Sequence, residues 1–291
     1  MSSYSYAAPT SVDEAVEVLA TNAASGQRTQ CLAGGTDVLV QMSSVDREPR
    51  LLVDVKHIEE TNAIDIGNNE IYIGAAIPSA ILNENEELKA LLPGLIESAD
   101  LIGSTQIQGR ASIGGNLCNS SPAGDTIPAL IAVGAQCVIA GPDGTREVAT
   151  EDFITGVGTN CMSDSEFLLG LKIPRPGART SDAYLRFIPR TEMDIAVAGA
   201  GVALTLDENG VCTAARVSIG AVAPTALLVQ EAADALIGTN VDDVALQAAA
   251  DACSAAASPI SDKRGTVVYR RKVVGVLCKR AGAIARDRAS A

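Results

Sequence analysis

The chain has 291 residues, which is enough for two or three compact units, each with its own core. Apolar residues make up 47% of it but aromatic residues only 3%, with no Trp, so Ala, Val, Ile and Leu must build the cores. The net charge is -13, from 35 acids and 22 bases. This charge argues against a nucleic-acid or anionic-membrane surface, because phosphate groups are bound through an excess of Lys and Arg. We therefore expect protein or small-molecule partners.

The cysteine pattern and the N-terminus indicate a cytoplasmic protein. No C-x-x-C pair occurs, the number of cysteines is odd and their spacings are wide, which disfavours a disulfide framework and a zinc or iron–sulfur site in this chain. Residues 1–9 lack the apolar core of a secretory signal, and no run approaches the ~20 apolar residues that span a bilayer. The seven cysteines are Cys31, Cys118, Cys137, Cys161, Cys212, Cys253 and Cys278.

The first 55 residues predict a small unit in which strands and helices alternate. Ser11 and Glu14 have the S-x-x-E spacing of a capping box, which marks the start of a helix. In chain order we expect a strand at Ser3–Tyr6, a helix at Val12–Asn22, a strand at Thr29–Leu32, a helix at Val38–Met42 and a strand at Arg50–Val55.

A first glycine segment, Leu32–Asp37, lies between the second predicted strand and the helix that follows. It contains a Gly pair, then a hydroxyl side chain and then an acid. Without side chains, the two glycines leave main-chain N–H groups bare beside a bound group. A strand, a glycine turn and a helix in this order suit a bound phosphate.

The following stretch, to about residue 175, predicts a hairpin, helices and further strands, with a second glycine segment among them. We expect strands at Ile64–Gly67 and Glu70–Gly74, helices at Pro78–Leu91 and Gly94–Leu101, a short helix at Thr126–Ala132, and strands at Gln136–Ala140, Thr145–Val148 and Glu166–Ile173.

We expect the second glycine segment, Arg110–Asp125, to be a loop like the first, because it also has a Gly pair followed by small polar residues and an acid. Two such segments suggest a diphosphate ligand. Neither fits the G-x-G-x-x-G fingerprint or the G-x-x-x-x-G-K-[ST] loop, so a nucleotide here requires a different fold. Gly pairs also serve turns that bind nothing, Asp37 and Asp125 can act as turn or cap carboxylates, and Cys118 is typical of a small buried thiol.

The C-terminal part begins near Pro174–Gly177, where Pro and Gly interrupt the pattern. A hairpin is predicted at Ala196–Leu206 and Val211–Gly220, followed by helices at Thr225–Leu236, Asp242–Ala257 and Gly265–Arg288. The last helix is basic. We interpret Arg270–Lys272 as a solvated helix face, with subunit docking as the alternative, and the single His57 as a strand-end or surface residue.

Several separate motifs together resemble one known family. They are Ala33–Asp37, Thr105–Ile107, Ser112–Asp125, Asp194–Ala196 and Ser218–Pro224. In this order they resemble the FAD-binding medium subunit of molybdenum hydroxylases, the family of xanthine dehydrogenase and aerobic carbon monoxide dehydrogenase. The resemblance extends over nearly the whole chain.

The resemblance implies an α+β fold with two domains. Residues 1–175 would form an FAD-binding domain of the vanillyl-alcohol-oxidase-like (PCMH-type) fold, with subdomains at about 1–55 and 56–175. Residues 176–291 would form a C-terminal domain with a small antiparallel sheet and helices.

The resemblance also implies the cofactor-binding residues, by position. The two glycine segments would wrap the FAD diphosphate, and Asp125 would contact the ribose or adenine half. Arg186 carries a planar guanidinium group where many relatives have Lys. Ile102 stands at a position that can be aromatic in relatives. The complete set is Leu32, Ala33, Gly34, Gly35, Thr36, Asp37, Val38, Ile102, Thr105, Ala111, Ser112, Ile113, Gly114, Gly115, Asn116, Asp125, Leu168 and Arg186.

As a function, the resemblance implies an FAD-carrying electron-transfer subunit with no catalytic side chain and no metal of its own. A large partner would hold the molybdenum cofactor and a small partner two [2Fe–2S] clusters, in a dimer of heterotrimers. The substrate and the electron acceptor stay open. A self-contained flavin oxidoreductase is an alternative that needs its own base and commonly a covalent His or Cys link, and a binding protein that has lost the flavin is another.

Overall fold

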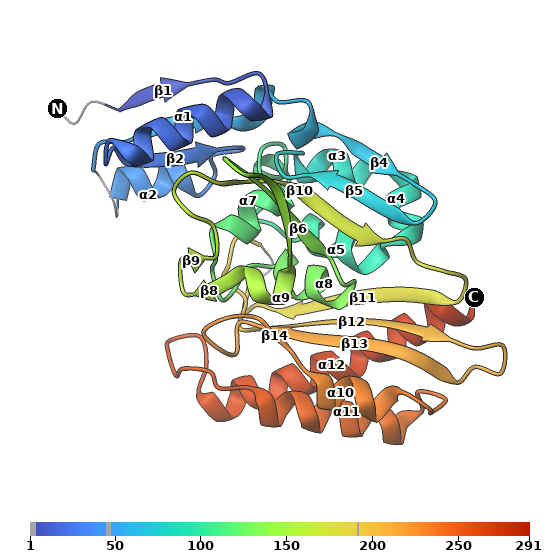
Figure 1. Ribbon diagram of the computed structural model, residues 1–291. Coiled ribbons are helices and arrows are strands. Elements are labelled where there is room, and N and C mark those ends of the chain that lie inside the picture. The colour runs from blue at the N-terminus through green and yellow to red at the C-terminus, as the bar shows by residue number, and fades with distance from the viewer. Residues whose placement is uncertain (1–3, 45–47, 191) are drawn as a thin grey trace.

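The computed structural model describes residues 4–44, 48–190 and 192–291, and it confirms the predicted α+β class. Three sheets follow one another along the molecule, with helices packed between and outside them (Figure 1). Their strand orders are β1-β3-β2, β4-β5-β10-β6-β7 and β11-β12-β13-β14. A further two-stranded pair is formed by β8 (Ile154–Gly156) and β9 (Thr159–Asn160).

The N-terminal sheet is parallel, with β3 between β1 and β2. Its elements are β1 (Ser5–Ala7), α1 (Val12–Ala24), β2 (Thr29–Leu32), α2 (Val38–Ser44) and β3 (Leu51–Asp54). Ser11 caps α1 by accepting the Glu14 N–H, as the capping spacing predicts. Ser3, which we expected in the first strand, lies outside the described residues. Because β2 and β3 are parallel neighbours, their carboxyl ends meet at one edge, where the first glycine segment begins.

The middle sheet is antiparallel and covered on both faces. Its strands are β4 (Ile64–Ile66), β5 (Glu70–Gly74), β6 (Gln136–Gly141), β7 (Gly144–Ala149) and β10 (Phe167–Pro174). One face packs with α1 and β3 in an apolar cluster that includes Leu19 and Phe167. The other face packs with helices. These are α3 (Ser79–Glu84), α4 (Glu86–Leu91), α5 (Pro93–Asp100), α7 (Ile113–Cys118), α8 (Thr126–Ala132) and α9 (Thr150–Phe153), while α6 (Thr105–Gln108) contacts α3 and α5.

Two predictions for this region were wrong. The single helix expected at Pro78–Leu91 is broken at Asn85, whose backbone is extended and whose side chain caps α4 by accepting the Leu88 N–H. The second glycine segment is not a loop throughout, because α7 begins at Ile113 and runs through both glycines. Gly114 allows this helix to pack closely, since a Cβ there would lie 2.4 Å from the Ala75 carbonyl oxygen.

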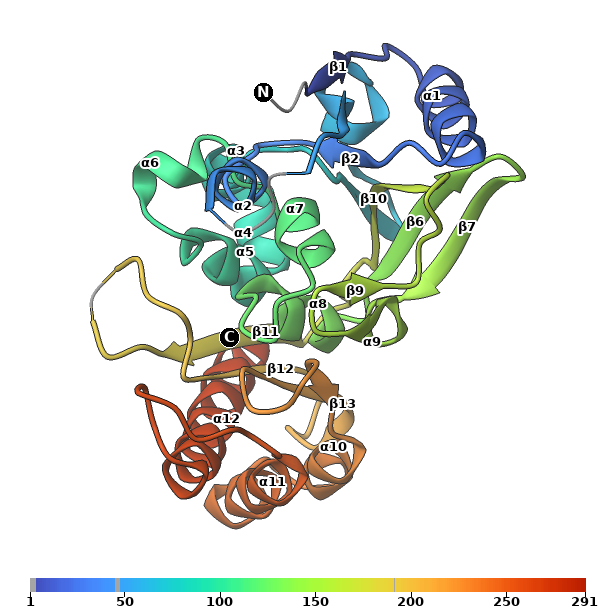
Figure 2. The same cartoon turned by 90° about the vertical axis from the view of Figure 1, so that its left-hand side faces the viewer.

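The C-terminal sheet is antiparallel and lies between two layers of helices (Figures 1 and 2). Helices α5 and α8 contact one side, and α10, α11 and α12 form an apolar core with the other. The sequence reading missed β11 and extended the helix of α10 back over β14. The elements are β11 (Thr180–Phe187), β12 (Ala198–Leu206), β13 (Cys212–Gly220), β14 (Leu227–Leu228), α10 (Gln230–Leu236), α11 (Asp243–Ala256) and α12 (Val267–Ser290).

The basic cluster on α12 is only partly solvated. Arg271 and Lys272 are exposed, as expected, but Arg270 is buried. Its guanidinium donates to the carbonyl oxygens of Val197 and Ala221, 3.1 Å away in each case, and pairs with Asp262. This arginine therefore supports the loops beside the sheet. None of the helices in the described ranges is long and apolar enough to cross a membrane.

Candidate functional site

The two glycine segments, far apart in the sequence, lie in direct contact. A Cβ on Gly34 would lie 1.7 Å from the carbonyl oxygen of Arg110, at the start of the second segment. A second link joins the helices that follow, because the Gln41 side chain on α2 donates to the Asn119 side chain at the end of α7 over 2.9 Å. The structure thus brings together the segments from which the sequence predicted a diphosphate site.

Main-chain N–H groups in both segments have no acceptor within the described chain. In the first segment these groups belong to residues 34–37, and Gly35 has the positive φ of 76° that favours glycine. In the second, Ser112 accepts the Gly115 N–H over 3.0 Å, while those of Ile113 and Gly114 are not bonded to the chain. Unpaired N–H groups from two touching segments form a surface suited to an anion.

Asn116 and Asp125 continue the site from the second segment toward the C-terminal sheet. The Asn116 side-chain oxygen accepts the Thr126 N–H and hydroxyl, over 3.1 Å and 2.8 Å. The Asp125 Oδ2 in turn accepts a hydrogen bond from Arg186 Nη1 on β11, over 2.7 Å. Two residues that were predicted separately to face the cofactor therefore form an ion pair with each other.

The ion pair leaves one buried oxygen without a partner, namely Asp125 Oδ1. Burial raises the pKa of Asp125 to about 6, although the charge and hydrogen bond of Arg186 act in the opposite direction. A buried carboxylate oxygen without a donor is costly, so it favours a ligand that supplies one. A ribose hydroxyl or an adenine amino group is such a donor. The unpaired N–H groups fit the diphosphate of FAD, and the unpaired Asp125 oxygen fits a hydroxyl or amino donor on its ribose or adenine.

The remaining predicted residues have less direct positions. Ile102 is buried just after α5, and Thr105 is exposed at the start of α6, in the stretch leading to the second glycine segment. Leu168 is 4% exposed and packs in the same apolar core as Ile113 and Leu117. The side chains of Leu168 and Ile113 therefore contribute to the core beneath α7.

The two cysteines near the glycine segments are poor nucleophiles. Burial raises the pKa of Cys31 to about 12, and burial also raises the pKa of Cys118. Both thiols therefore stay protonated at neutral pH, whereas only the thiolate form is a nucleophile. Cys118 fits its interpretation as a structural thiol, and His57 is exposed. In the described part of the chain, no three or more His, Cys, Asp or Glu side chains are grouped so as to hold a metal ion.

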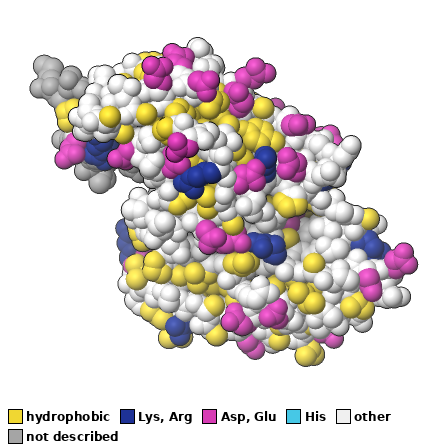
Figure 3. Space-filling view, in the orientation of Figure 1, with side chains coloured by type: hydrophobic (Ala, Val, Ile, Leu, Met, Phe, Trp, Pro, Cys, Tyr) yellow, Lys and Arg dark blue, Asp and Glu magenta, His cyan; other side chains and the backbone are white. Residues whose placement is uncertain are grey.

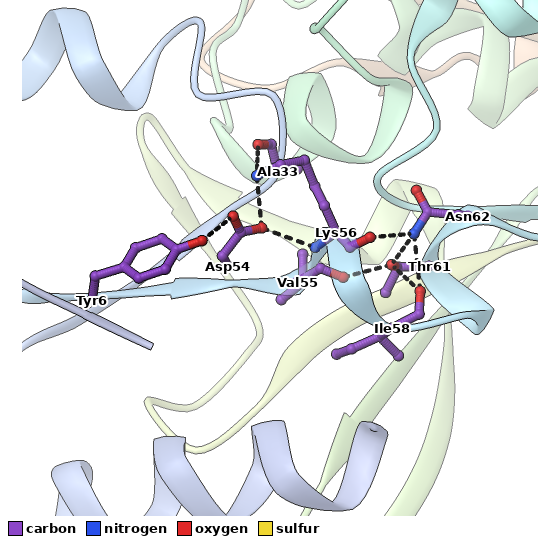
Figure 4. A network of polar contacts seen from close by, with 8 residues as sticks. All are labelled: Tyr6, Ala33, Asp54, Val55, Lys56, Ile58, Thr61 and Asn62. Atoms are coloured by element: carbon purple, nitrogen blue, oxygen red, sulfur yellow. Dashed lines mark hydrogen bonds and ion pairs between the residues drawn. The ribbon is translucent and has the colours of Figure 1, made fainter. Parts of the chain in front are cut away.

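Sequence reasoning missed three residues behind the first glycine segment: Tyr6, Asp54 and Lys56 (Figure 4). The Lys56 ammonium donates to the carbonyl oxygen of Ala33 and to Asp54, and the Tyr6 hydroxyl donates to Asp54. The sequence feature that could have indicated them is an acid and a lysine at the end of a buried strand. Only the parallel pairing of β2 with β3, which the sequence does not reveal, places that lysine beside Ala33.

A separate cleft of about 460 Å³ lies between the α8 region and the C-terminal sheet. Its lining includes Leu92, Val133, Arg175 and Asp182 and, among the described residues, none of the predicted cofactor positions. In the space-filling view, acidic side chains are spread over the face shown and basic ones occur among them without forming a continuous stripe (Figure 3). The glycine segments, rather than this cleft, carry the features of the predicted site.

Two family models match the chain. Residues 2–176 match the FAD binding domain in molybdopterin dehydrogenase, and residues 183–284 match the CO dehydrogenase flavoprotein C-terminal domain. The carbon monoxide dehydrogenase medium chain of Afipia carboxidovorans is 34% identical over 99% of this chain and 98% of its own. The nicotinate dehydrogenase FAD-subunit of Eubacterium barkeri is 28% identical over 84% of this chain and 83% of its own. A structure of carbon monoxide dehydrogenase from Hydrogenophaga pseudoflava contains a chain with a TM-score of 0.92 and 34% identity, and 98% of each chain is covered.

Proposed function

The chain belongs to the family of FAD-binding subunits of molybdopterin dehydrogenases, and from this we propose that it carries FAD as the electron-transfer subunit of a molybdenum-dependent hydroxylase complex. Electrons would come from [2Fe–2S] clusters on a small partner subunit, while a large partner with the molybdenum cofactor would oxidise the substrate. The bound flavin supplies the redox chemistry, and the chain binds, orients and shields it. The observation that carries the proposal is the contact of two glycine segments with unpaired N–H groups.

We propose roles for the individual residues on the same basis. The main chains of residues 32–38 and 111–116 would hold the diphosphate, and Asp125 would accept a hydrogen bond from the ribose or adenine half. Arg186 would fix the Asp125 carboxylate, and through it join β11 to the site. Ile102, Thr105 and Leu168 would shape the surroundings of the cofactor. None of these residues needs to take a proton from a substrate.

The domain division is part of the proposal. Residues 1–175 would act as the FAD-binding domain, with subdomains at about 1–55 and 56–175, and residues 176–291 as its cover. The three separate sheets support this division, and the ion pair between Asp125 and Arg186 across the proposed boundary supports the role of residues 176–291 as a cover. We also propose a dimer of heterotrimers in the cytoplasm. The absence of disulfides among the seven cysteines supports that location.

The alternative of a self-contained flavin oxidoreductase is less well supported. A covalent flavin link needs a His or Cys near the ring, yet His57 is exposed and the pKa of Cys31 and of Cys118 is raised by burial. A binding protein that has lost the flavin has no need for the unpaired N–H groups or for the buried orphan oxygen of Asp125.

The proposal is tested by anaerobic mixing. The FAD-loaded chain is combined with its small iron–sulfur partner after that partner has been reduced with dithionite and freed of excess reductant. We expect the flavin to become reduced while the electron paramagnetic resonance signal of the reduced clusters is lost, and the flavin to stay oxidised when the partner is omitted. A flavin that remains oxidised beside the reduced partner would refute the electron-transfer role.

A further inference from the structure

Lys56 forms a clamp behind the first glycine segment, at the edge where β2 and β3 end side by side (Figure 4). Its Nζ donates to the Ala33 carbonyl oxygen over 2.9 Å and to Asp54 Oδ1 over 2.6 Å. The side chains of Lys56 and Asp54 are 26% and 6% exposed. One cation thus joins the last residue before the Gly pair to the end of the neighbouring strand.

The Asp54 carboxylate is itself held in place. Its Oδ2 accepts the Tyr6 hydroxyl over 2.7 Å, and its Oδ1 also accepts the Lys56 main-chain N–H over 3.0 Å. Although burial acts in the opposite direction, the hydrogen bonds from Lys56 and Tyr6 lower the pKa of Asp54. The carboxylate is therefore charged at neutral pH and fixes the position of the lysine ammonium.

The main chain of Lys56 is fixed as well. It lies in the short turn Val55–His57, whose C-terminal side is tied by two side chains. The Thr61 hydroxyl lies 2.7 Å from the Val55 carbonyl oxygen, and the Asn62 side-chain amide donates to that of Lys56 over 2.9 Å. Both ends of the lysine are therefore anchored before any ligand binds.

This anchoring determines the direction of one N–H group in the glycine segment. The C=O and N–H of a trans peptide point in opposite directions, so a fixed Ala33 carbonyl fixes the N–H of Gly34 on the other side. That N–H has no acceptor within the described chain. A positive charge at the carbonyl also polarises the peptide, which makes its N–H a stronger donor.

We propose that Lys56 is a positioning residue that holds the Ala33–Gly34 peptide so that the Gly34 N–H donates to the diphosphate of FAD. The proposal rests on the proposed function, because it takes FAD as the ligand. Lys56 does not contact the diphosphate itself, and it acts on the Gly34 N–H only through the Ala33–Gly34 peptide. Asp54 and Tyr6 keep the ammonium in place.

The test compares Lys56→Gln, Lys56→Arg and a matched control, Lys172→Gln. Lys172 also has its Nζ 2.6 Å from a carboxylate oxygen, that of Glu147, but on the middle sheet. FAD affinity of the full chain is measured by fluorescence titration, and ³¹P NMR reports on the bound diphosphate. We expect Lys56→Gln to weaken FAD binding about tenfold and to shift the ³¹P signals. Lys56→Arg should restore most of the affinity, and Lys172→Gln should match the wild type.

Three results would overturn the proposal, given a wild-type chain that binds FAD. One is a Lys56→Gln variant with unchanged affinity and ³¹P signals. Another is weaker binding with unchanged ³¹P signals, which would show a role away from the diphosphate. The third is a large fall in the melting temperature of the ligand-free variant that Lys56→Arg does not reverse, which would mark Lys56 as a structural brace. A wild-type chain that fails to bind FAD would instead refute the proposed function.

Discussion

The contact between the two glycine segments makes Gly34→Ala the most informative substitution. The added Cβ would lie 1.7 Å from the Arg110 carbonyl oxygen and 2.4 Å from the carbonyl carbon, whereas Cβ contacts under 3.0 Å essentially do not occur. The segments must therefore separate by at least 1.3 Å, the step from 1.7 Å to 3.0 Å. Backbone lies on both sides, so no flexible side chain can absorb this shift.

The expected loss follows from the hydrogen bonds that the shift would break. About two N–H bonds to the diphosphate, each contributing about 1.5 kcal/mol, correspond to about 3 kcal/mol. Since about 1.4 kcal/mol is a tenfold change, FAD should bind about 100-fold more weakly. The overpacked contact should also lower the free energy of unfolding of the ligand-free chain by about 1–3 kcal/mol.

The assay is calorimetric or fluorescence titration with FAD, together with urea unfolding of the ligand-free chain. Gly177→Ala is the matched control, because its Cβ would meet only Thr180 Oγ1 at an ordinary 3.9 Å. Gly35→Ala gives an intermediate case, since its φ of +76° is strained but the side chain of Leu32, the nearest neighbour, can move. A Gly34→Ala variant that binds FAD within threefold of the wild type would refute the reasoning.

Three further predictions concern buried polar groups and thiols. Burial raises the pKa of Asp182 to about 6, so this residue makes the wild-type chain less stable as the pH rises from about 4 to about 6. Asp182→Asn should remove this pH dependence. In urea titrations, the free energy of unfolding of the variant minus that of the wild type should therefore increase by about 2–3 kcal/mol between about pH 4 and about pH 6. A difference that does not change with pH would contradict this. Arg270→Met should lower the free energy of unfolding in urea by about 2–4 kcal/mol, because it leaves buried carbonyl oxygens unpaired. Lys272→Met, at an exposed position, should change it by less than about 0.5 kcal/mol. Equal effects would show that the buried contacts contribute little. Cys31 is partly buried and burial raises its pKa to about 12, so it should react with a thiol reagent at pH 8 much more slowly in the folded chain than in denaturant. Equal rates would argue against a raised pKa.

Regular local patterns predicted most of the fold. The capping spacing at Ser11 located α1, and alternation located the hairpins of the middle and C-terminal sheets. The strand β11 was missed because it follows a Pro- and Gly-rich stretch and lies between two helical layers, so its burial pattern shows little alternation. The break at Asn85 depends on a single side chain that caps the next helix within an otherwise helical pattern.

The candidate site could be predicted only in part. The Gly pairs indicated both main-chain segments, but their contact at Gly34 and Arg110 depends on tertiary packing. The pairing of Asp125 with Arg186 likewise joins residues 61 positions apart. Lys56 was overlooked because its role depends on which strands are neighbours in the parallel sheet, and sequence alone does not give that order.

The central claim is that this chain binds FAD without a covalent link and cannot use a substrate alone. The most direct test is the visible spectrum of the purified full chain with excess FAD, followed by acid release and identification of the flavin. The account predicts a flavin spectrum, complete release of FAD by acid, and no bleaching by carbon monoxide, aldehydes or purines without partner subunits. A chain that fails to bind FAD, or a bound flavin that a small substrate bleaches unaided, would contradict it.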